Sequence, residues 1–258
     1  MKIDELIRQV ELIAPLDLQE PWDHSGWQLK VTNGDVSRVL VSLEVNEKVI
    51  DEAVSLRADL ILSHHPLYFN GMKEIDCNNI IGNHTIRLIR EGISVYSTHT
   101  PFDKCEGGNN DYLGGLIGAE NIRTLPGDES GICRMGRLHA PMTAEAFIRL
   151  MEEKLRIDKR FFSFTGDLSD VIQMVGWCSG AGAEFADIAV DAGCDLFFTG
   201  DVKYHTAQHA KDIGMNLLDC GHFGTEYLFA ENMCRHLDKI EKMDIIQSQV
   251  DLNPFTLL

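Results

Sequence analysis

The chain has 258 residues, 44% of them apolar, and it carries 23 Lys and Arg against 40 Asp and Glu, a formal net charge of −17. This apolar content can bury a full core, so the composition excludes a disordered chain and allows one large domain or two modest ones. The negative charge is spread along the sequence and repels phosphate backbones, which argues against non-specific nucleic-acid binding. It leaves open a nucleotide held in a local pocket.

The N-terminus and the cysteines indicate where the protein works. Acidic residues occur from Asp4 onward, and the basic and then apolar run of a secretory signal is missing. No apolar stretch approaches the roughly 20 residues that cross a bilayer. The seven cysteines are odd in number and form no Cys-x-x-Cys pair, a pattern that favours reduced thiols. We therefore expect a soluble, cytoplasmic protein.

The first half of the chain alternates helical and strand patterns. Apolar residues at helical spacing run from Ile3 to Ile13, and Pro15 ends this predicted helix. Strands are predicted over residues 39–43, 58–63 and 93–97, with helices between them from Asn46 and over 85–90. Strands that alternate with helices predict a parallel sheet with right-handed crossovers.

A second lobe is expected to begin after Gly127, where strands become shorter and more frequent. Its predicted strands and the last strands of the chain cover residues 133–138, 161–164, 171–176, 195–198, 215–218 and 243–246. Helices are predicted over 147–155, from the glycine-rich segment 180–183, after Gly200 and around Glu226. The chain therefore reads as α/β throughout.

Three of the predicted strands lead directly to polar side chains. His64 and His65 follow one strand, His99 and Asp103 follow another, and His222 follows a third. Ligands of open parallel sheets bind beyond the carboxyl ends of the strands, because the loops there gather side chains at one edge. These strand ends are therefore the candidate functional site.

The residue types at these strand ends are typical of a metal site. Glu226 lies four residues after His222, so both point to the same side if a helix begins there. Imidazoles and carboxylates bind zinc, iron, manganese, nickel or cobalt. Four donors saturate a tetrahedral ion, and the chain offers more, with His64 and His65 pointing in different directions. We expect two divalent ions roughly 3.5 to 4 Å apart, bridged by Asp103 or Glu226.

The alternative role for these histidines is ordinary hydrogen bonding. A single histidine at a strand end is more often a hydrogen-bonding loop residue than a metal ligand. We assign that hydrogen-bonding role to His24, His84, His139 and His236. The alternative is weaker for His64 and His65, because two adjacent imidazoles after an apolar strand need partners when they are buried.

Four segments occur in the order in which a known family has them. They are HHPL at 64–67, HTPFD at 99–103, GGNND at 107–111 and GHFGTE at 221–226. With the segments 22–28 and 200–205, they make the chain resemble the NIF-three-like family of dinuclear metal-centre proteins, known as type-two GTP cyclohydrolase homologues. His24 and Trp27 depart from the Asn and Leu usual in the first of these segments, which affects the wall of the pocket.

The resemblance implies two similar α/β lobes with mainly parallel sheets. Residues 1–126 and 215–258 would form the metal-binding lobe, and residues 127–214 the second lobe. It also implies two divalent ions, of zinc, iron, manganese or nickel, and a ring-shaped homohexamer with the metals facing an internal cavity. The implied metal ligands are His64, His65, Asp103, His222 and Glu226.

Hydrolysis is the activity expected of such a centre, because two metal ions lower the pKa of a bridging water and supply a metal-bound hydroxide. The resemblance narrows this to opening a purine ring, as GTP cyclohydrolase does. His99 and His205 are the candidate proton shuttles, and Lys203 is a candidate contact for an anionic substrate. Two alternatives stay open: a two-metal nucleotide phosphoesterase, and a non-catalytic metal-binding interaction or regulatory protein.

Overall fold

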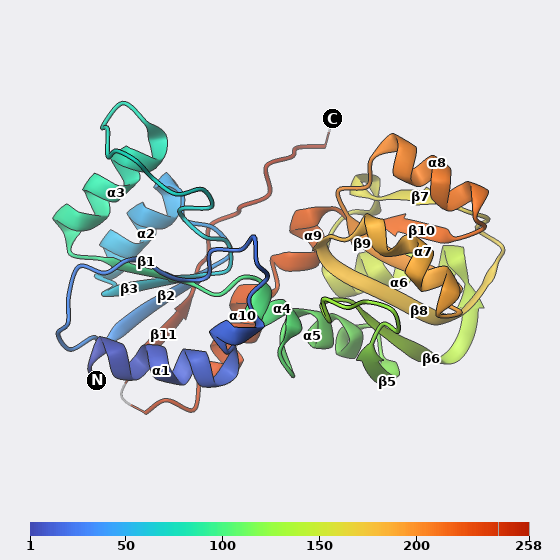
Figure 1. The fold of residues 1–258 in the computed structure, drawn as a ribbon, viewed down its shortest axis with the longest axis horizontal. Coiled ribbons are helices and arrows are strands. Elements are labelled where there is room, and N and C mark those ends of the chain that lie inside the picture. The colour runs from blue at the N-terminus through green and yellow to red at the C-terminus, as the bar shows by residue number, and fades with distance from the viewer. Residues whose placement is uncertain (242, 258) are drawn as a thin grey trace. The chain divides into compact units, whose positions relative to one another are not determined.

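The strands of the chain form two separate β-sheets, in a computed structural model that describes residues 1–241 and 243–257 (Figure 1). Each sheet lies within its own compact unit, and each unit contains helices as well as strands. The first unit comprises Met1–Gly108 and Leu228–Leu252, and the second comprises Asn109–Tyr227 and the residues from Asn253 onward. The predicted fold of two α/β lobes is confirmed.

The bounds of the units differ from the sequence expectation, which placed residues 109–126, 215–227 and those from Asn253 onward in the first lobe. Strand pairing explains the first two differences. The segment Ala119–Thr124 pairs with Arg134–Thr143, and Asn216–Asp219 pairs with Leu196–Gly200, so both belong to the second sheet. Periodicity shows which residues are buried but not which strand pairs with which, so the sequence pattern did not reveal these pairings.

The sheet of the first unit has the strand order β1-β4-β3-β2-β11. Its strands are β1 (Gly26–Leu29), β2 (Arg38–Ser42), β3 (Leu60–Ser63), β4 (Ser94–Ser97) and β11 (Asp244–Gln247). The four strands from β4 to β11 are parallel, as predicted, whereas the edge strand β1 runs antiparallel to β4. The carboxyl ends of β2, β3 and β4 therefore lie side by side.

Helices cover both faces of this sheet. They are α1 (Ile3–Ile13), α2 (Glu47–Leu56), α3 (Ile80–Glu91), α4 (Thr100–Lys104) and α10 (Phe229–Leu237), with the short 3-10 helix Leu16–Leu18 after α1. Figure 1 shows α2 and α3 on one side of the sheet and α1 on the other. The side chain of Asn46 accepts a hydrogen bond from the Val49 amide and caps α2, as its place before the apolar periodicity predicts.

The core between the sheet and α2 and α3 is made by alternate strand residues. Leu40, Ile61 and Val95 occupy neighbouring positions in the three central strands and are fully buried. They pack with apolar residues of the two helices, including Val49 and Leu88. This packing fixes the strand ends from which the polar side chains emerge.

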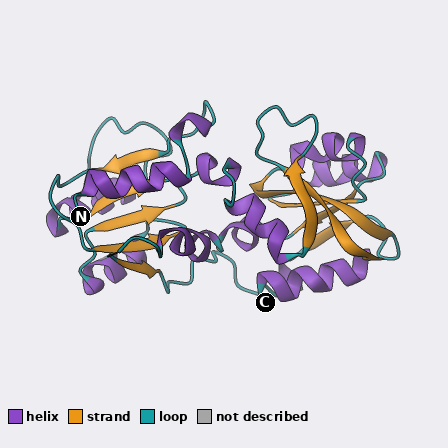
Figure 2. Cartoon of the chain, turned by 90° about the horizontal axis from the view of Figure 1, so that it is seen from below, coloured by secondary structure: helices purple, strands orange, loops and turns teal. Residues whose placement is uncertain are grey.

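The second sheet has the strand order β5-β6-β8-β9-β10-β7. Its strands are β5 (Ala119–Thr124), β6 (Arg134–Thr143), β7 (Ser163–Thr165), β8 (Val171–Ala181), β9 (Leu196–Gly200) and β10 (Asn216–Asp219). Only β8, β9 and β10 are parallel neighbours, so this sheet is mixed and not mainly parallel. A short connection joins β5 to β6, which favours antiparallel pairing. Figure 2 shows the long, twisted strands of this sheet.

The second unit also places helices on both faces of its sheet. They are α5 (Asn109–Leu116), α6 (Ala144–Leu155), α7 (Ala186–Asp191), α8 (Tyr204–Asp212) and α9 (His222–Glu226), with 3-10 turns at Lys159–Phe161 and Ala183–Phe185. Residues of α7 and α8 pack on Phe197, while Phe147 of α6 contacts Phe198, which stacks on Trp177. The helix predicted from the segment 180–183 begins only at Ala183, as the 3-10 helix that precedes α7, because β8 continues to Ala181.

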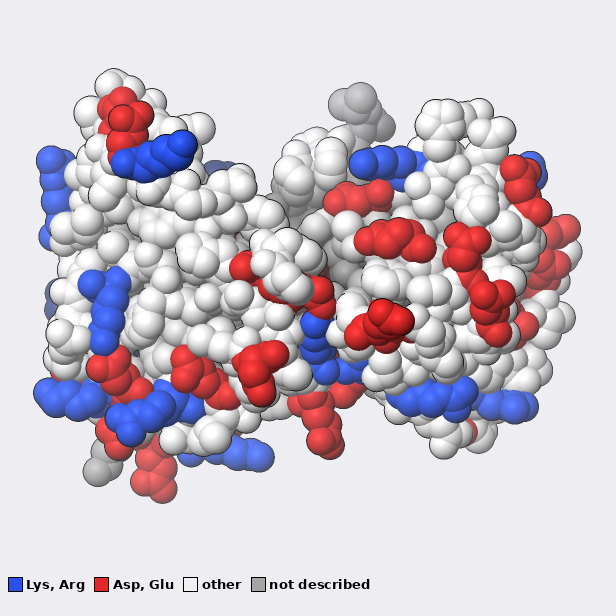
Figure 3. All heavy atoms as spheres, viewed as in Figure 1, with Lys and Arg blue, Asp and Glu red and all other residues white. Residues whose placement is uncertain are grey.

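The last two features of the fold are its helix lengths, which bear on membrane insertion, and the distribution of charge on its surface. Among the helices that the structure describes, none combines the length and apolarity needed to cross a membrane. On the face drawn in Figure 3, lysine and arginine side chains form small groups interspersed with acidic ones.

Candidate metal centre

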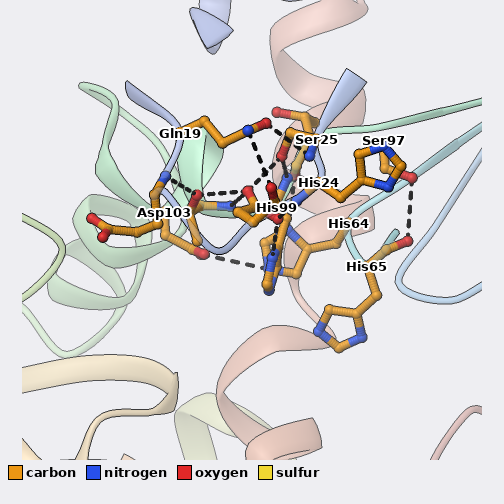
Figure 4. Close-up of polar contacts among 12 residues, drawn as sticks. Gln19, His24, Ser25, His64, His65, Ser97, His99 and Asp103 are labelled. Atoms are coloured by element: carbon orange, nitrogen blue, oxygen red, sulfur yellow. Dashed lines mark hydrogen bonds and ion pairs between the residues drawn. The ribbon is translucent and has the colours of Figure 1, made fainter. Parts of the chain in front are cut away.

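Three histidines of the first unit come together at the carboxyl ends of β3 and β4. His64 and His65 follow β3 directly, and His99 follows β4 after one residue. One ligand atom from each of the three lies within 4.8 Å of the other two, and their ring centroids are 5.0 to 5.4 Å apart (Figure 4). For the first unit, the prediction that neighbouring strand ends bring these side chains together is confirmed.

Each of these histidines holds its Nδ1 atom against an oxygen. Nδ1 of His64 lies 3.0 Å from the Thr98 carbonyl, and Nδ1 of His65 lies 2.7 Å from the Glu44 carboxylate. Nδ1 of His99 lies 2.9 Å from Oδ1 of Asp23. These oxygens accept hydrogen bonds, so Nδ1 carries a proton in each ring, as it does in histidines that bind a metal ion through Nε2.

Asp103 adds a carboxylate to the three imidazoles. It lies in α4, just after β4, and its Oδ1 is 3.6 Å from Nε2 of His64. Both side chains are buried, His64 completely and Asp103 to within a few per cent. Burying a carboxylate costs less when a cation neutralises it, and three neutral imidazoles beside one carboxylate form a typical donor set for zinc or a related divalent ion. The residues of this unit therefore fit a metal ion.

Asp23 anchors the position of His99. Its carboxylate also accepts hydrogen bonds from the hydroxyls of Ser25 and Thr100, at 2.8 and 2.6 Å. Burial by itself raises the pKa of Asp23, but the hydrogen bond from His99, followed by those from Thr100 and Ser25, outweighs it. The pKa of Asp23 is thereby held well below its usual range, so the group stays a carboxylate and keeps His99 oriented.

A second set of candidate ligands belongs to the second unit. His222 and Glu226 lie in α9, and Nε2 of His222 is 2.9 Å from Oε2 of Glu226, which confirms that the two share one helix face. Nδ1 of His222 lies 2.7 Å from the Asp201 carboxylate, the same arrangement as in the first unit. Because β10 leads into α9, these two residues are not in the unit where the sequence analysis expected them.

Gly180 leaves room for the Glu226 side chain. Its φ angle is +67°, and a Cβ atom built on it would lie 2.1 Å from Oε1 of Glu226. A side chain at this position would displace the carboxylate. Glycine is therefore required here by both conformation and space.

The other predicted site residues lie at the start of α8. His205 is exposed, and its ring packs edge-on against Tyr204, with centroids 5.2 Å apart. Lys203 is also exposed and directly precedes this helix. The roles predicted for them, a proton shuttle and a contact for an anionic substrate, stay predictions.

The histidines assigned to hydrogen bonding all have ordinary partners, as expected. The partners are the Tyr68 carbonyl for His24, Glu47 for His84, Glu120 for His139 and the Gly107 carbonyl for His236. The sequence analysis missed the acids that orient the ligand histidines, namely Asp23, Glu44 and Asp201. Glu44 and Asp201 lie just beyond β2 and β9, each beside a strand that ends at a candidate ligand, so a search of all strand ends for acids would have found them.

Comparisons with known proteins find relatives of the whole chain. The sequence profile described as Duf34/NIF3 (NGG1p interacting factor 3) matches residues 1–254. A curated protein of Clostridium perfringens named GTP cyclohydrolase 1 type 2 homolog is 34% identical over 266 residues, with 100% of both chains covered.

Two crystal structures have the same fold over nearly all of their length. A Bacillus cereus protein related to NIF3 superimposes with a TM-score of 0.93 at 22% identity, covering 100% of this chain and 99% of that one. A hypothetical protein of Staphylococcus aureus superimposes with a TM-score of 0.91 at 25% identity, with the same coverage.

Proposed function

The chain belongs to the Duf34/NIF3 family, and on that premise we propose that it binds divalent metal ions and uses them to catalyse a hydrolysis. The observation that carries the proposal is the cluster of His64, His65 and His99, whose ligand atoms lie within 4.8 Å of one another and whose Nδ1 atoms are each held by an oxygen. Structural hydrogen bonding alone would not require three imidazoles to meet at one strand edge.

The proposed ligands are His64, His65, Asp103, His222 and Glu226, and the proposed number of ions is two. The number of donors supports this count, because five exceed the four that one tetrahedral ion accepts. The three proposed ligand histidines, His64, His65 and His222, each have an oxygen partner on Nδ1, as ligand histidines usually do.

The residues around the centre have distinct tasks in the proposed reaction. A divalent ion held by the proposed ligands would supply Lewis-acid activation of water. His99 moves a proton at Nε2, since the hydrogen bond to Asp23 fixes the orientation of its ring. Asp23, Glu44 and Asp201 hold the imidazoles in the tautomer and orientation that metal binding needs.

The proposed substrate class is a purine nucleotide whose ring is opened by hydrolysis. Support comes from the name of the Clostridium perfringens relative, which describes it as a GTP cyclohydrolase homologue. Phosphoester hydrolysis and metal binding without turnover are the competing functions, and one experiment separates all three.

In that experiment, the protein is purified with a defined metal, its metal content is measured by elemental analysis, and it is incubated with GTP. Formate release supports ring opening, whereas phosphate release supports the phosphoesterase. The H64A/H65A double variant should lose metal and activity, and the matched control H139A, which removes an exposed histidine, should keep both.

Metal binding without either product above the H64A/H65A background would favour the regulatory protein. A protein that binds no divalent ion in this experiment would contradict the proposal as a whole.

A further inference from the structure

Two large aromatic side chains are exposed in the first unit and contact each other. Trp22 is 57% exposed and Phe69 is 52% exposed. Their ring centroids are 6.1 Å apart, with an angle of 35° between the planes. Exposed aromatic groups that touch one another mark binding sites more often than isolated apolar residues do. We call Trp22 and Phe69 the aromatic wall.

The aromatic wall lies against the candidate metal centre. The Trp22 ring meets the His99 ring edge-on, with centroids 5.7 Å apart, and the Phe69 ring does so at 6.1 Å. His99 is in turn 5.0 Å from His64 and 5.4 Å from His65, centroid to centroid. A molecule lying on the wall would therefore be next to the three imidazoles.

Hydrogen bonds join the two loops that carry the wall. Nδ1 of His24 lies 2.5 Å from the Tyr68 carbonyl, and the Tyr68 amide donates to the Gln28 side chain at 3.0 Å. The Gln28 amide group donates back to the His24 carbonyl at 2.7 Å. These bonds hold the residues beside Trp22 and Phe69 together, so the wall is formed before any ligand arrives.

The geometry favours stacking against the wall over insertion between the two rings. A ring inserted between them would need two van der Waals contacts of about 3.5 Å, roughly 7 Å in all, and the wall rings are already in contact. A cavity of about 480 Å³ opens beside Phe69, and Leu67, Met72 and Lys73 also line it. This cavity adjoins the wall at Phe69, and neither Trp22 nor His99 lines it.

We propose that the aromatic wall of Trp22 and Phe69 binds the planar heterocyclic ring of the substrate by stacking and presents the edge of that ring to the metal centre. This inference rests on the proposed hydrolase, because it names the part of the substrate that the same site recognises. The ring, and not the sugar or the phosphates, then accounts for the affinity that the wall contributes.

Guanosine and ribose test the inference, because they share the sugar and differ in the planar ring. Isothermal titration calorimetry of the metal-loaded protein should show binding of guanosine and no measurable binding of ribose. The variants W22L and F69L should each weaken guanosine binding about 5- to 150-fold, the range found when a stacking side chain is removed from a base. W22F keeps a ring and should weaken binding about 5-fold or less.

The control variant is L12A, because Leu12 is a large apolar residue of α1 that is 76% exposed and does not belong to the aromatic wall. It should bind guanosine as the unaltered protein does, and metal content should be the same in all variants. Guanosine binding that is absent, or unchanged in both W22L and F69L, would overturn the stacking site even if the protein hydrolyses GTP. Stacking that persists in a protein without bound metal or turnover would instead contradict the proposed hydrolase.

Discussion

At the scale of single residues, the site depends on the carboxylates that contact the Nδ1 atoms of its histidines. Asp23 and His99 are 76 residues apart in the sequence and form a buried hydrogen bond. Asp23 also accepts hydrogen bonds from Ser25 and Thr100, so one carboxylate fixes the His99 ring and the start of α4 together. Removing it should affect the metal site and the stability of the fold in ways that can be separated.

D23N tests this role. The amide cannot accept as strongly from Nδ1 of His99, so metal affinity or activity should fall about 10- to 100-fold, as is typical for partners of ligand histidines. Elemental analysis after dialysis against a chelator measures the affinity. The control is S55A. Ser55 lies on the exposed end of α2, so its substitution should leave metal affinity unchanged.

The pH dependence of stability follows from the same group. Because the folded pKa of Asp23 is depressed, its contribution to the free energy of unfolding is present above the unfolded pKa of about 4. It is lost as the pH falls below that value. Thermal unfolding should therefore show a D23N defect at pH 7 that shrinks as the pH is lowered from 4, and a constant defect would contradict this assignment.

At the scale of elements, the second set of ligands depends on the contact between β8 and α9. Gly180 in β8 faces Glu226 in α9, and Thr225 of the same helix accepts a hydrogen bond from the Gly180 amide at 2.9 Å. Helix and strand are thus joined at the residue that positions the carboxylate.

G180A tests whether this contact is needed. Its Cβ would crowd Glu226, so we expect a loss of stability and a lower metal content. The control G193A has a similar φ of +78° but no atom within 4 Å of its Cβ, so it should show only the cost of the left-handed backbone, about 1 to 2 kcal/mol. Urea unfolding and elemental analysis measure both. Equal effects of the two variants would contradict the crowding argument.

At the scale of the whole molecule, the expected assembly is a ring of six chains. Light scattering coupled to size-exclusion chromatography should then give six times the chain mass of 28.9 kDa. The measurement should be repeated for H64A/H65A, because a ring held by protein surfaces keeps its mass without the metal ligands. A monomeric mass for the unaltered protein would contradict the expected hexamer.

Local sequence patterns predicted much of the first unit and of its candidate site. The alternation of helices and strands, the cap at Asn46 and the placement of His64, His65 and His99 beyond adjacent strands were all predicted before the fold was considered. The antiparallel pairing of β1, β5, β6 and β7 was not. Periodicity shows which residues are buried, but it does not say which strand lies beside which.

The sequence by itself determined the α/β class, the donor types and their positions at strand ends, because residue chemistry and helical or strand periodicity are local properties. Only the tertiary structure decided that Asp23 holds His99, that Trp22 and Phe69 form a wall, and that His222 and Glu226 belong to the second sheet's unit. Each of these depends on residues that are distant in the chain, and strand pairing and packing alone bring such residues into contact.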